Sequence, residues 1–250
     1  GLHLYKDWYF IFLLIGMIRV FYGICFLIYI LFLFFWSLFL SKKKIIKQPS
    51  RIANFIIKET CKKIIFFSNT KLHLQGFEKM PEQPCLFVSN HTSMFDAIAM
   101  LAILKKSVCC VTKMENERIP ICGPFIHHAG YISLDRSNAF HAVKSIQKAA
   151  EYIETNTASI YICPEGTRSK TGEMLPFHPG SFKIATKTEA DIVLISISGA
   201  NQVKKNFPFR RSHIYITLVD VLSHEAYHDK KTVEIADIAY EIIKNDLKEK

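Results

Sequence analysis

The feature that most constrains this chain is an almost wholly apolar run from Trp8 to Leu40, interrupted by a single charged residue, Arg19. As a helix, the uncharged residues 21–40 would span about 30 Å, the thickness of the hydrocarbon core of a bilayer. The whole run would reach about 50 Å, which is too long for a simple span. Residues 1–40 are therefore predicted to form a membrane-embedded helical segment. Two arrangements remain open: a span at 21–40 after an interfacial helix, or a helical hairpin, bent near residues 19–23, that enters one leaflet.

Basic charge is concentrated directly after this run. The chain carries 32 Lys and Arg against 22 Asp and Glu, a formal net charge of +10. Residues 1–63 hold ten of these cations and only two of the acids, so the rest of the chain is close to neutral. A basic segment beside an apolar anchor is attracted to an anionic membrane surface, at about 1 kcal/mol per Lys or Arg. A nucleic-acid binder would carry its cations on the folded domain instead. The alternative interpretation is a solvated basic face that keeps the chain soluble.

Residues 41–68 are predicted to form a basic amphipathic linker helix, with Pro49 in its first turn, where the missing N–H does no harm. The block Lys42–Lys44 at its start predicts that the following domain lies on the cytoplasmic side of the membrane, because basic residues beside an apolar span stay in the cytoplasm.

The remaining residues, 69–250, are predicted to form one domain in which strands and helices alternate. Strands are expected at 72–76, 84–89, 107–112, 131–134, 159–163, 192–198 and 213–219, and helices at 93–105, 138–154 and 232–248. Alternation of this kind predicts an α/β fold, a layered mixed β-sheet flanked by helices. In such folds, the functional site lies at the carboxyl ends of the strands.

The cysteines and histidines do not form a recognisable metal-binding or disulfide pattern. Seven cysteines occur, an odd number, with no Cys-x-x-Cys pair. This favours free buried thiols in a reducing compartment over a disulfide framework or a zinc site. The adjacent His127 and His128 cannot readily share one ion, so no metal site is expected.

The segment Asn90–Asp96 contains the first candidate catalytic residues. A histidine can act as a general base near neutral pH, and a carboxylate can hold one ring nitrogen while the other faces a substrate hydroxyl. Five residues along a helix rotate by about 500°, so His91 and Asp96 within one helix would point about 140° apart. Contact between them therefore requires His91 just before the helix and Asp96 in its first turns. The alternative is a helix cap plus a surface residue.

Two further segments could hold an anion. Glu165–Arg168 follows a predicted strand, and its glycine lets backbone N–H groups approach an anion, while Arg168 offers a two-pronged phosphate contact. Arg136 lies between a strand and a capped helix, a favourable position for binding phosphate, and Lys113 starts another loop. Taken singly, each segment is also compatible with a tight turn or a surface ion pair of little energetic weight.

Taken together, these segments resemble the glycerolipid acyltransferases. Asn90-His91 with Asp96, Gly130 with Arg136, and Pro164-Glu-Gly-Thr-Arg168 occur in the order and spacing of that family, across roughly residues 70 to 200. The similarity is greatest to the PlsC-type 1-acyl-glycerol-3-phosphate acyltransferases.

The resemblance implies that His91 deprotonates the free hydroxyl of a lysophospholipid and that Asp96 orients it. The alkoxide would attack the thioester of acyl-CoA or an acyl-carrier protein and give phosphatidic acid, with no cofactor, because the thioester is already activated. The implied partners are lysophosphatidic acid, the acyl donor and membrane phospholipids, and no nucleic acid. Acceptor-binding roles are implied for Lys113, Arg136, Glu165, Gly166, Thr167 and Arg168, with Glu165 supporting the turn and Gly166 and Thr167 shaping it.

The chain departs from the family pattern in two places. Leu194 stands where the family's apolar strand usually has a proline, which concerns the shape of the acyl pocket. His178-Pro179 stands where a basic pair is common, which concerns contacts with the acceptor. The alternatives are the same fold acting on glycerol-3-phosphate, another lysophospholipid or an amino-acid lipid, or a membrane scaffold without activity. A serine hydrolase is disfavoured, because no Gly-x-Ser-x-Gly sequence occurs.

Overall fold

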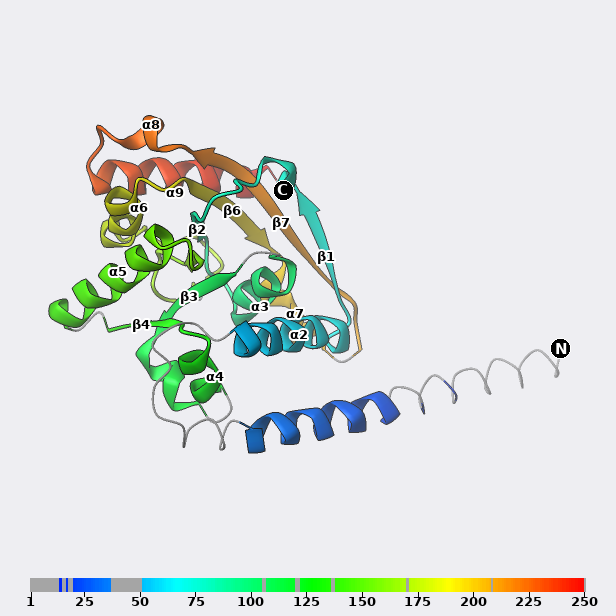
Figure 1. The fold of residues 1–250 in the computed structure, drawn as a ribbon. Coiled ribbons are helices and arrows are strands. Elements are labelled where there is room, and N and C mark those ends of the chain that lie inside the picture. The colour runs from blue at the N-terminus through cyan, green and yellow to red at the C-terminus, as the bar shows by residue number, and fades with distance from the viewer. Residues whose placement is uncertain are drawn as a thin grey trace.

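The computed structural model in Figure 1 describes residues 14, 17, 20–36, 51–104, 107–119, 122–135, 138–169, 171–207 and 209–249. Several predictions concern residues outside these ranges: most of the apolar run before residue 20, its end at 37–40, Lys42–Lys44, Pro49 and Arg136.

Two helices precede the sheet and pack against each other. Residues 20–36 are helical, and α2 covers Arg51–Phe67. The hydroxyl oxygens of Tyr29 and Thr60 lie 2.7 Å apart, and the rings of Phe26 and Phe67 are 4.6 Å apart. Within the described ranges, no helix has both the length and the apolar character needed to cross a bilayer. The membrane-embedded segment at residues 1–40 therefore stays a prediction.

A seven-stranded sheet forms the centre of the molecule, in the order β1-β7-β6-β2-β5-β3-β4. Neighbouring strands are parallel except β6 and β7, which are antiparallel. The predicted mixed sheet is therefore confirmed. The strands are β1 (Thr70–Gln75), β2 (Leu86–Ser89), β3 (Val108–Lys113), β4 (Ile132–Leu134), β5 (Ser159–Ile162), β6 (Ile192–Ser198) and β7 (Ser212–Leu222).

Helices cover both faces of this sheet (Figure 1). The connection from β2 to β3 and the connection from β4 to β5 run in opposite directions along the sheet, so right-handed crossovers place α3 and α5 on opposite faces. The helix α6 packs beside α5, α9 packs against β6, and α2 packs on α3. The helices are α3 (Met94–Ile103), α4 (Cys122–His128), α5 (Ala139–Glu154), α6 (Lys183–Thr188), α7 (Val203–Asn206), α8 (His224–Tyr227) and α9 (Thr232–Lys248).

The core lies around β2, β5 and β6. Every residue of β2 and β5 is buried, as is β6 up to Ile197, which matches continuous apolar runs in strands covered on both faces. Leu194, at the position of the expected proline, is fully buried. The register of β6 with β7 shifts between Leu194 and Ile195, although no proline is present there.

Cys61, Cys85, Cys109 and Cys110 are free and buried thiols, as the sequence predicts. Cys163 is free but only half-buried, and Cys25 is free and exposed, so the prediction of burial is wrong for Cys25. Burial raises the pKa of Cys109 to about 12, so this thiol stays protonated and packs as a small apolar group. No cluster of three or more His, Cys, Asp or Glu side chains suited to a metal ion occurs in the part of the chain that the structure describes.

Candidate active site

His91 and Asp96 meet at the junction between β2 and α3. The strand ends at Ser89 and the helix begins at Met94, so His91 lies before the helix and Asp96 in its first turn. His91 Nδ1 lies 3.0 Å from Asp96 Oδ2. The sequence prediction of this contact, and of the placement that it requires, is met. The Asp96 carboxylate is completely buried, whereas the side chain of His91 is 22% exposed.

The Asp96 carboxylate also closes the amino end of α3. Its Oδ2 accepts hydrogen bonds from the backbone N–H groups of Thr92 and Ser93, each at 2.7 Å. Ser93 in turn accepts a hydrogen bond from the backbone N–H of Phe95, which completes a capping box. The helix cap and the contact with histidine, which the sequence presents as alternatives, are therefore both functions of one carboxylate.

Opposing effects act on the protonation of His91. Burial disfavours the imidazolium, but hydrogen bonds with Asp96 and Cys163 and the charge of Asp96 outweigh it and raise the pKa of His91. A buried carboxylate beside the ring stabilises the positive charge that appears when the imidazole takes up a proton. An imidazole in this environment is a stronger base than a free one, because its protonated form is stabilised.

The Glu165 side chain forms a hydrogen bond with the backbone of His91. Its Oε1 accepts a hydrogen bond of 2.6 Å from the His91 backbone N–H, and its Oε2 accepts one of 2.9 Å from the backbone N–H of Leu175. The residue is only 3% exposed. Burial raises the pKa of Glu165, and the two backbone hydrogen bonds oppose that shift. Its contacts are with the protein's own backbone, which fits the supporting role that the resemblance implies.

The loop after β5 is also tied directly to the loop after β2. The Ser169 backbone N–H donates to the His91 carbonyl oxygen at 3.0 Å and so joins the two loops. Within the segment after β5, the His178 backbone N–H donates to the Pro164 carbonyl oxygen at 3.1 Å. Gly166 has a φ of +68°, and its N–H donates to the Cys163 carbonyl, so a glycine suits this tight turn. The turn places Thr167 and Arg168 at the surface.

Lys113 lies at the exposed carboxyl end of β3, next to β5 in the sheet, and therefore on the same edge as His91 and the turn at Glu165–Arg168. Its register partner on β4 is Leu134, two positions before Arg136 in the sequence. The structure thus brings His91, Asp96 and Glu165 into one hydrogen-bonded group, and it places Lys113 and Arg168 on the same sheet edge without a contact between them.

Two features of this site were not anticipated from individual residues. The buried side chain of Asn90 donates to the Ile197 carbonyl at 2.9 Å and accepts from the Ile197 N–H at 2.8 Å, as a strand backbone would. Two residues before His91, Ser89 Oγ lies 2.8 Å from Tyr161 Oη and 3.6 Å from Cys163 Sγ. Asn90 could have been found from its place next to His91 in the motif, whereas the sequence carries no signal for the contacts of Cys163.

Comparison with known proteins places this chain in a class. The Acyltransferase family model matches residues 71–198, which include all of β1 but its first residue, β2 to β6, and the whole hydrogen-bonded group around His91. The chain belongs to the acyltransferase family.

Curated proteins similar to this chain are named as acyltransferases as well. The chain is 31% identical over 179 residues to a 1-acyl-sn-glycerol-3-phosphate acyltransferase of Saccharomyces cerevisiae, a match that covers 70% of this chain and 59% of the yeast protein. It is 34% identical over 135 residues to a chloroplastic enzyme of the same name from Brassica napus, which covers 53% of this chain and 39% of the plant protein. The matches thus span between about two fifths and three fifths of the length of these curated relatives.

The fold is shared with a solved structure. The crystal structure of PlsC from Thermotoga maritima, a 1-acyl-sn-glycerophosphate acyltransferase, superposes with a TM-score of 0.66. The match covers 89% of this chain and 88% of the other, at 21% sequence identity.

Proposed function

We propose that this protein transfers a fatty acyl group from an acyl thioester to the free hydroxyl of 1-acyl-glycerol-3-phosphate and so forms phosphatidic acid. The observation that carries this proposal is the contact between His91 Nδ1 and the buried Asp96 carboxylate at the carboxyl end of β2. Membership of the acyltransferase family and the names of the relatives support the reaction type and the acceptor.

In the proposed mechanism, His91 is the general base. With Nδ1 held by Asp96, Nε2 takes the proton of the acceptor hydroxyl as its oxygen attacks the carbonyl carbon of the thioester. The carbon–sulfur bond of the tetrahedral adduct then breaks, and the leaving thiolate takes the proton back from the imidazolium. The products are the new ester and the free thiol of CoA or of an acyl-carrier protein. Neither a nucleophilic side chain nor a cofactor is required.

Positive side chains on the same sheet edge would bind the acceptor phosphate. Arg168 is exposed in the turn after β5, and Lys113 is exposed at the end of β3. Arg136 follows β4 in the sequence and would complete the group. A guanidinium binds a phosphate through two parallel hydrogen bonds, which would fix the distance between the phosphate and the hydroxyl that faces His91. Gly166 and Thr167 would shape this turn, and Glu165 would hold it against His91.

Membrane attachment through the N-terminal part is the second half of the proposal. On the helix at 20–36, large apolar side chains face solvent rather than the domain. A contiguous apolar surface of this kind is unusual on a soluble protein and typical of a surface that binds a partner or a membrane. We infer insertion into the membrane with the acyltransferase domain on the cytoplasmic side, where the acyl donor is dissolved. The exposed side chains include Phe21, Tyr22, Ile24, Leu27, Ile28, Leu31, Phe32 and Phe35.

The test of the catalytic proposal is an acyl-transfer assay on the purified chain. It crosses acyl-CoA and acyl-carrier protein with lysophosphatidate, glycerol-3-phosphate and a monoacylglycerol that lacks the phosphate. His91→Ala is expected to lower the rate with lysophosphatidate by about 10² to 10⁴, the usual contribution of a general base. His141→Ala, an exposed histidine on α5, is the matched control and should retain the wild-type rate.

Each unexpected outcome has a definite meaning. A His91→Ala variant as active as the wild type contradicts the mechanism. A preference for the monoacylglycerol contradicts the proposed roles of Arg168 and Lys113, and no transfer to any acceptor supports the scaffold alternative.

A further inference from the structure

Three polar side chains that the proposed mechanism does not use meet next to His91. Ser89 Oγ lies 2.8 Å from Tyr161 Oη, and Cys163 Sγ lies 3.5 Å from the same phenol oxygen and 3.6 Å from Ser89 Oγ. Ser89 and Tyr161 are buried, and Cys163 is half-buried. Polar groups at such a depth destabilise a protein unless they are paired, so the way in which these three are paired matters.

Cys163 lies beside the imidazole of His91. The register of β2 with β5 makes Ser89 and Cys163 neighbours at the point where both strands end. Two residues further along each segment, the Glu165 carboxylate accepts the hydrogen bond of the His91 backbone N–H at 2.6 Å. The two segments are thus joined at both positions, which holds the thiol close to the ring. A hydrogen bond between the side chains of Cys163 and His91 is one of the causes of the raised pKa of His91.

The hydrogens of this group can be assigned, because each hydroxyl or thiol carries only one. Ser89 Oγ donates to the Asn90 carbonyl oxygen at 3.0 Å, so in its contact with Tyr161 the phenol is the donor. The Tyr161 oxygen in turn accepts the S–H of Cys163. With its hydrogen directed to Tyr161, the Cys163 sulfur has only lone pairs to offer His91 and is an acceptor there.

An acceptor at this place stabilises the charged ring more than the neutral one. In the neutral ring the single N–H, at Nδ1, is directed to the Asp96 carboxylate, and a second N–H exists only in the imidazolium. Besides Cys163, the titratable groups that face the ring are Asp96 from α3 and Glu165 from the segment after β5. Asp96 is bonded to Nδ1 and Glu165 to backbone N–H groups, so the sulfur supplies a separate contact.

We propose that Cys163 is a positioning residue for His91, whose sulfur accepts a hydrogen bond from the imidazolium that forms when His91 takes the proton of the acceptor hydroxyl. Tyr161 holds the thiol hydrogen away from the ring and so keeps the sulfur in the role of acceptor. This inference rests on the function proposed for His91, but it concerns a property of the free protein that can be measured without turnover.

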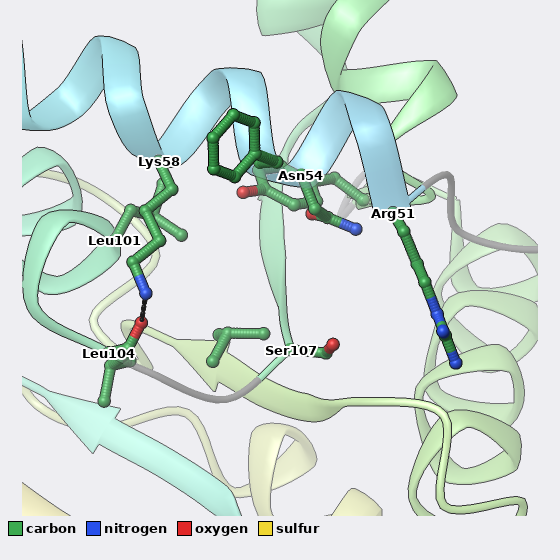
Figure 2. Close-up of a pocket in the computed structure, with 9 residues that line it drawn as sticks. Arg51, Asn54, Lys58, Leu101, Leu104 and Ser107 are labelled. Atoms are coloured by element: carbon green, nitrogen blue, oxygen red, sulfur yellow. Dashed lines mark hydrogen bonds between the residues drawn. The ribbon is translucent and has the colours of Figure 1, made fainter.

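This group is separate from the cavity beneath α2, which has a volume of about 290 Å³ (Figure 2). The cavity is lined by Ser107 and Val108 at the amino end of β3, whereas Cys163 follows the carboxyl end of β5. Because β3 and β5 are parallel, the two places lie at opposite ends of the sheet. A substitution at Cys163 therefore leaves the lining of this cavity unchanged.

The test combines pH–rate profiles with proton NMR titration of His91, whose signal is assigned by its absence in His91→Ala. Cys163→Ala removes the sulfur, Cys163→Ser replaces it with a smaller acceptor, and Tyr161→Phe frees the thiol hydrogen to turn towards the ring. Cys109→Ala is the matched control. It removes a buried thiol from β3, where the register pairs Cys109 with Ile160, so that its side chain lies on the face of the sheet opposite to Tyr161. Circular dichroism confirms that each variant is folded.

Cys163→Ala is expected to lower kcat about three- to tenfold with a nearly unchanged KM for lysophosphatidate, because the lost hydrogen bond forms to a charged group. The midpoints of the His91 titration and of the pH–rate profile should both fall by about half a pH unit to one unit, the same factor. Cys163→Ser should restore most of both effects, and Cys109→Ala should behave as the wild type. Tyr161→Phe should also lower the midpoint, and the double variant with Cys163→Ala should lower it no further than Cys163→Ala alone.

An unmoved His91 titration in Cys163→Ala overturns the proposal. Equal shifts in Cys163→Ala and Cys163→Ser do so as well, since they would reduce the contact to packing, and additive shifts in the double variant contradict the role of Tyr161. Failure of the proposed function is distinguishable from failure of this inference. A protein that transfers no acyl group still gives the titration of His91, whereas an active protein with an unmoved titration contradicts only the role of Cys163.

Discussion

The buried carboxylate of Glu165 permits a quantitative test of how the active site is held together. In Glu165→Gln the side chain keeps its shape, but its amide nitrogen cannot accept a hydrogen bond. One of the two backbone N–H groups now bonded to Glu165, that of His91 or that of Leu175, then loses its acceptor. A buried donor without a partner costs about 1 to 3 kcal/mol, and the remaining bond loses its charge assistance. Removal of a buried charge offsets part of this loss, because burial disfavours the ionised form of Glu165.

The loss of charge assistance and the removal of the buried charge act in opposite directions, so the net destabilisation expected is about 1 to 3 kcal/mol. For a chain of this size, this corresponds to a fall of about 2 to 12 °C in the midpoint of thermal unfolding. Because Glu165 contacts the His91 backbone and is almost fully buried, the turnover number should fall while the KM for lysophosphatidate stays nearly constant. Thermal denaturation followed by circular dichroism and steady-state kinetics measure the two effects, with Glu154→Gln on the exposed end of α5 as the control. A large rise in KM with an unchanged unfolding midpoint would refute this reasoning and make Glu165 a direct ligand of the acceptor.

Three further predictions concern the His91–Asp96 pair, Arg168 and Gly76. The raised pKa of His91 predicts that kcat/KM rises with pH through a midpoint above 6.5, and that the stabilisation from its pair with Asp96, complete below pH 6.5, is lost as pH rises through that midpoint. Asp96→Asn should move the kinetic midpoint to lower pH and reduce the plateau; an unmoved midpoint in pH–rate profiles would contradict the pairing. Arg168→Ala should raise the KM for lysophosphatidate about tenfold with little effect on the KM for the acyl donor, and equal effects on both would remove Arg168 from phosphate binding. Gly76→Ala should lower the free energy of unfolding by about 1 to 3 kcal/mol, because Gly76 has a φ of +78° and a Cβ there would collide with the Leu218 carbonyl; an unchanged urea midpoint would contradict this.

The sequence predicts the central strands well because their signals are local. Continuous apolar runs between turn residues define β2, β5 and β6, and the helix at Thr232–Lys248 agrees with the expected range. Helices shorter than two turns, such as α6 and α8, give no usable periodicity and were not predicted. The end of β7 at Leu222 was also missed, because pairing with β6 extends the strand beyond its apolar pattern.

At the candidate active site, the sequence identifies the functional side chains but not which residues form hydrogen bonds with them. The spacing from His91 to Asp96 specifies the placement that their contact requires, because both residues belong to one strand-to-helix junction, but by itself it leaves a simple helix cap as the alternative. The contacts of Glu165 with His91 and Leu175 join segments that are far apart in the chain, and no local pattern specifies them. The exposed ends of Lys113 and Arg168 raise a different difficulty, because their orientation depends on a ligand rather than on the fold.

The double use of the Asp96 carboxylate has a consequence for how a protein with the proposed activity can diversify. Because one side chain both starts α3 and holds His91, a substitution that alters the acid–base pair also loosens the helix that carries it. Selection for folding and selection for turnover therefore act on the same carboxylate, so a substitution of Asp96 affects both properties together. Changes in acceptor or donor preference have freer scope at the exposed turn around Arg168 and at the end of β3, where a new side chain leaves the junction intact.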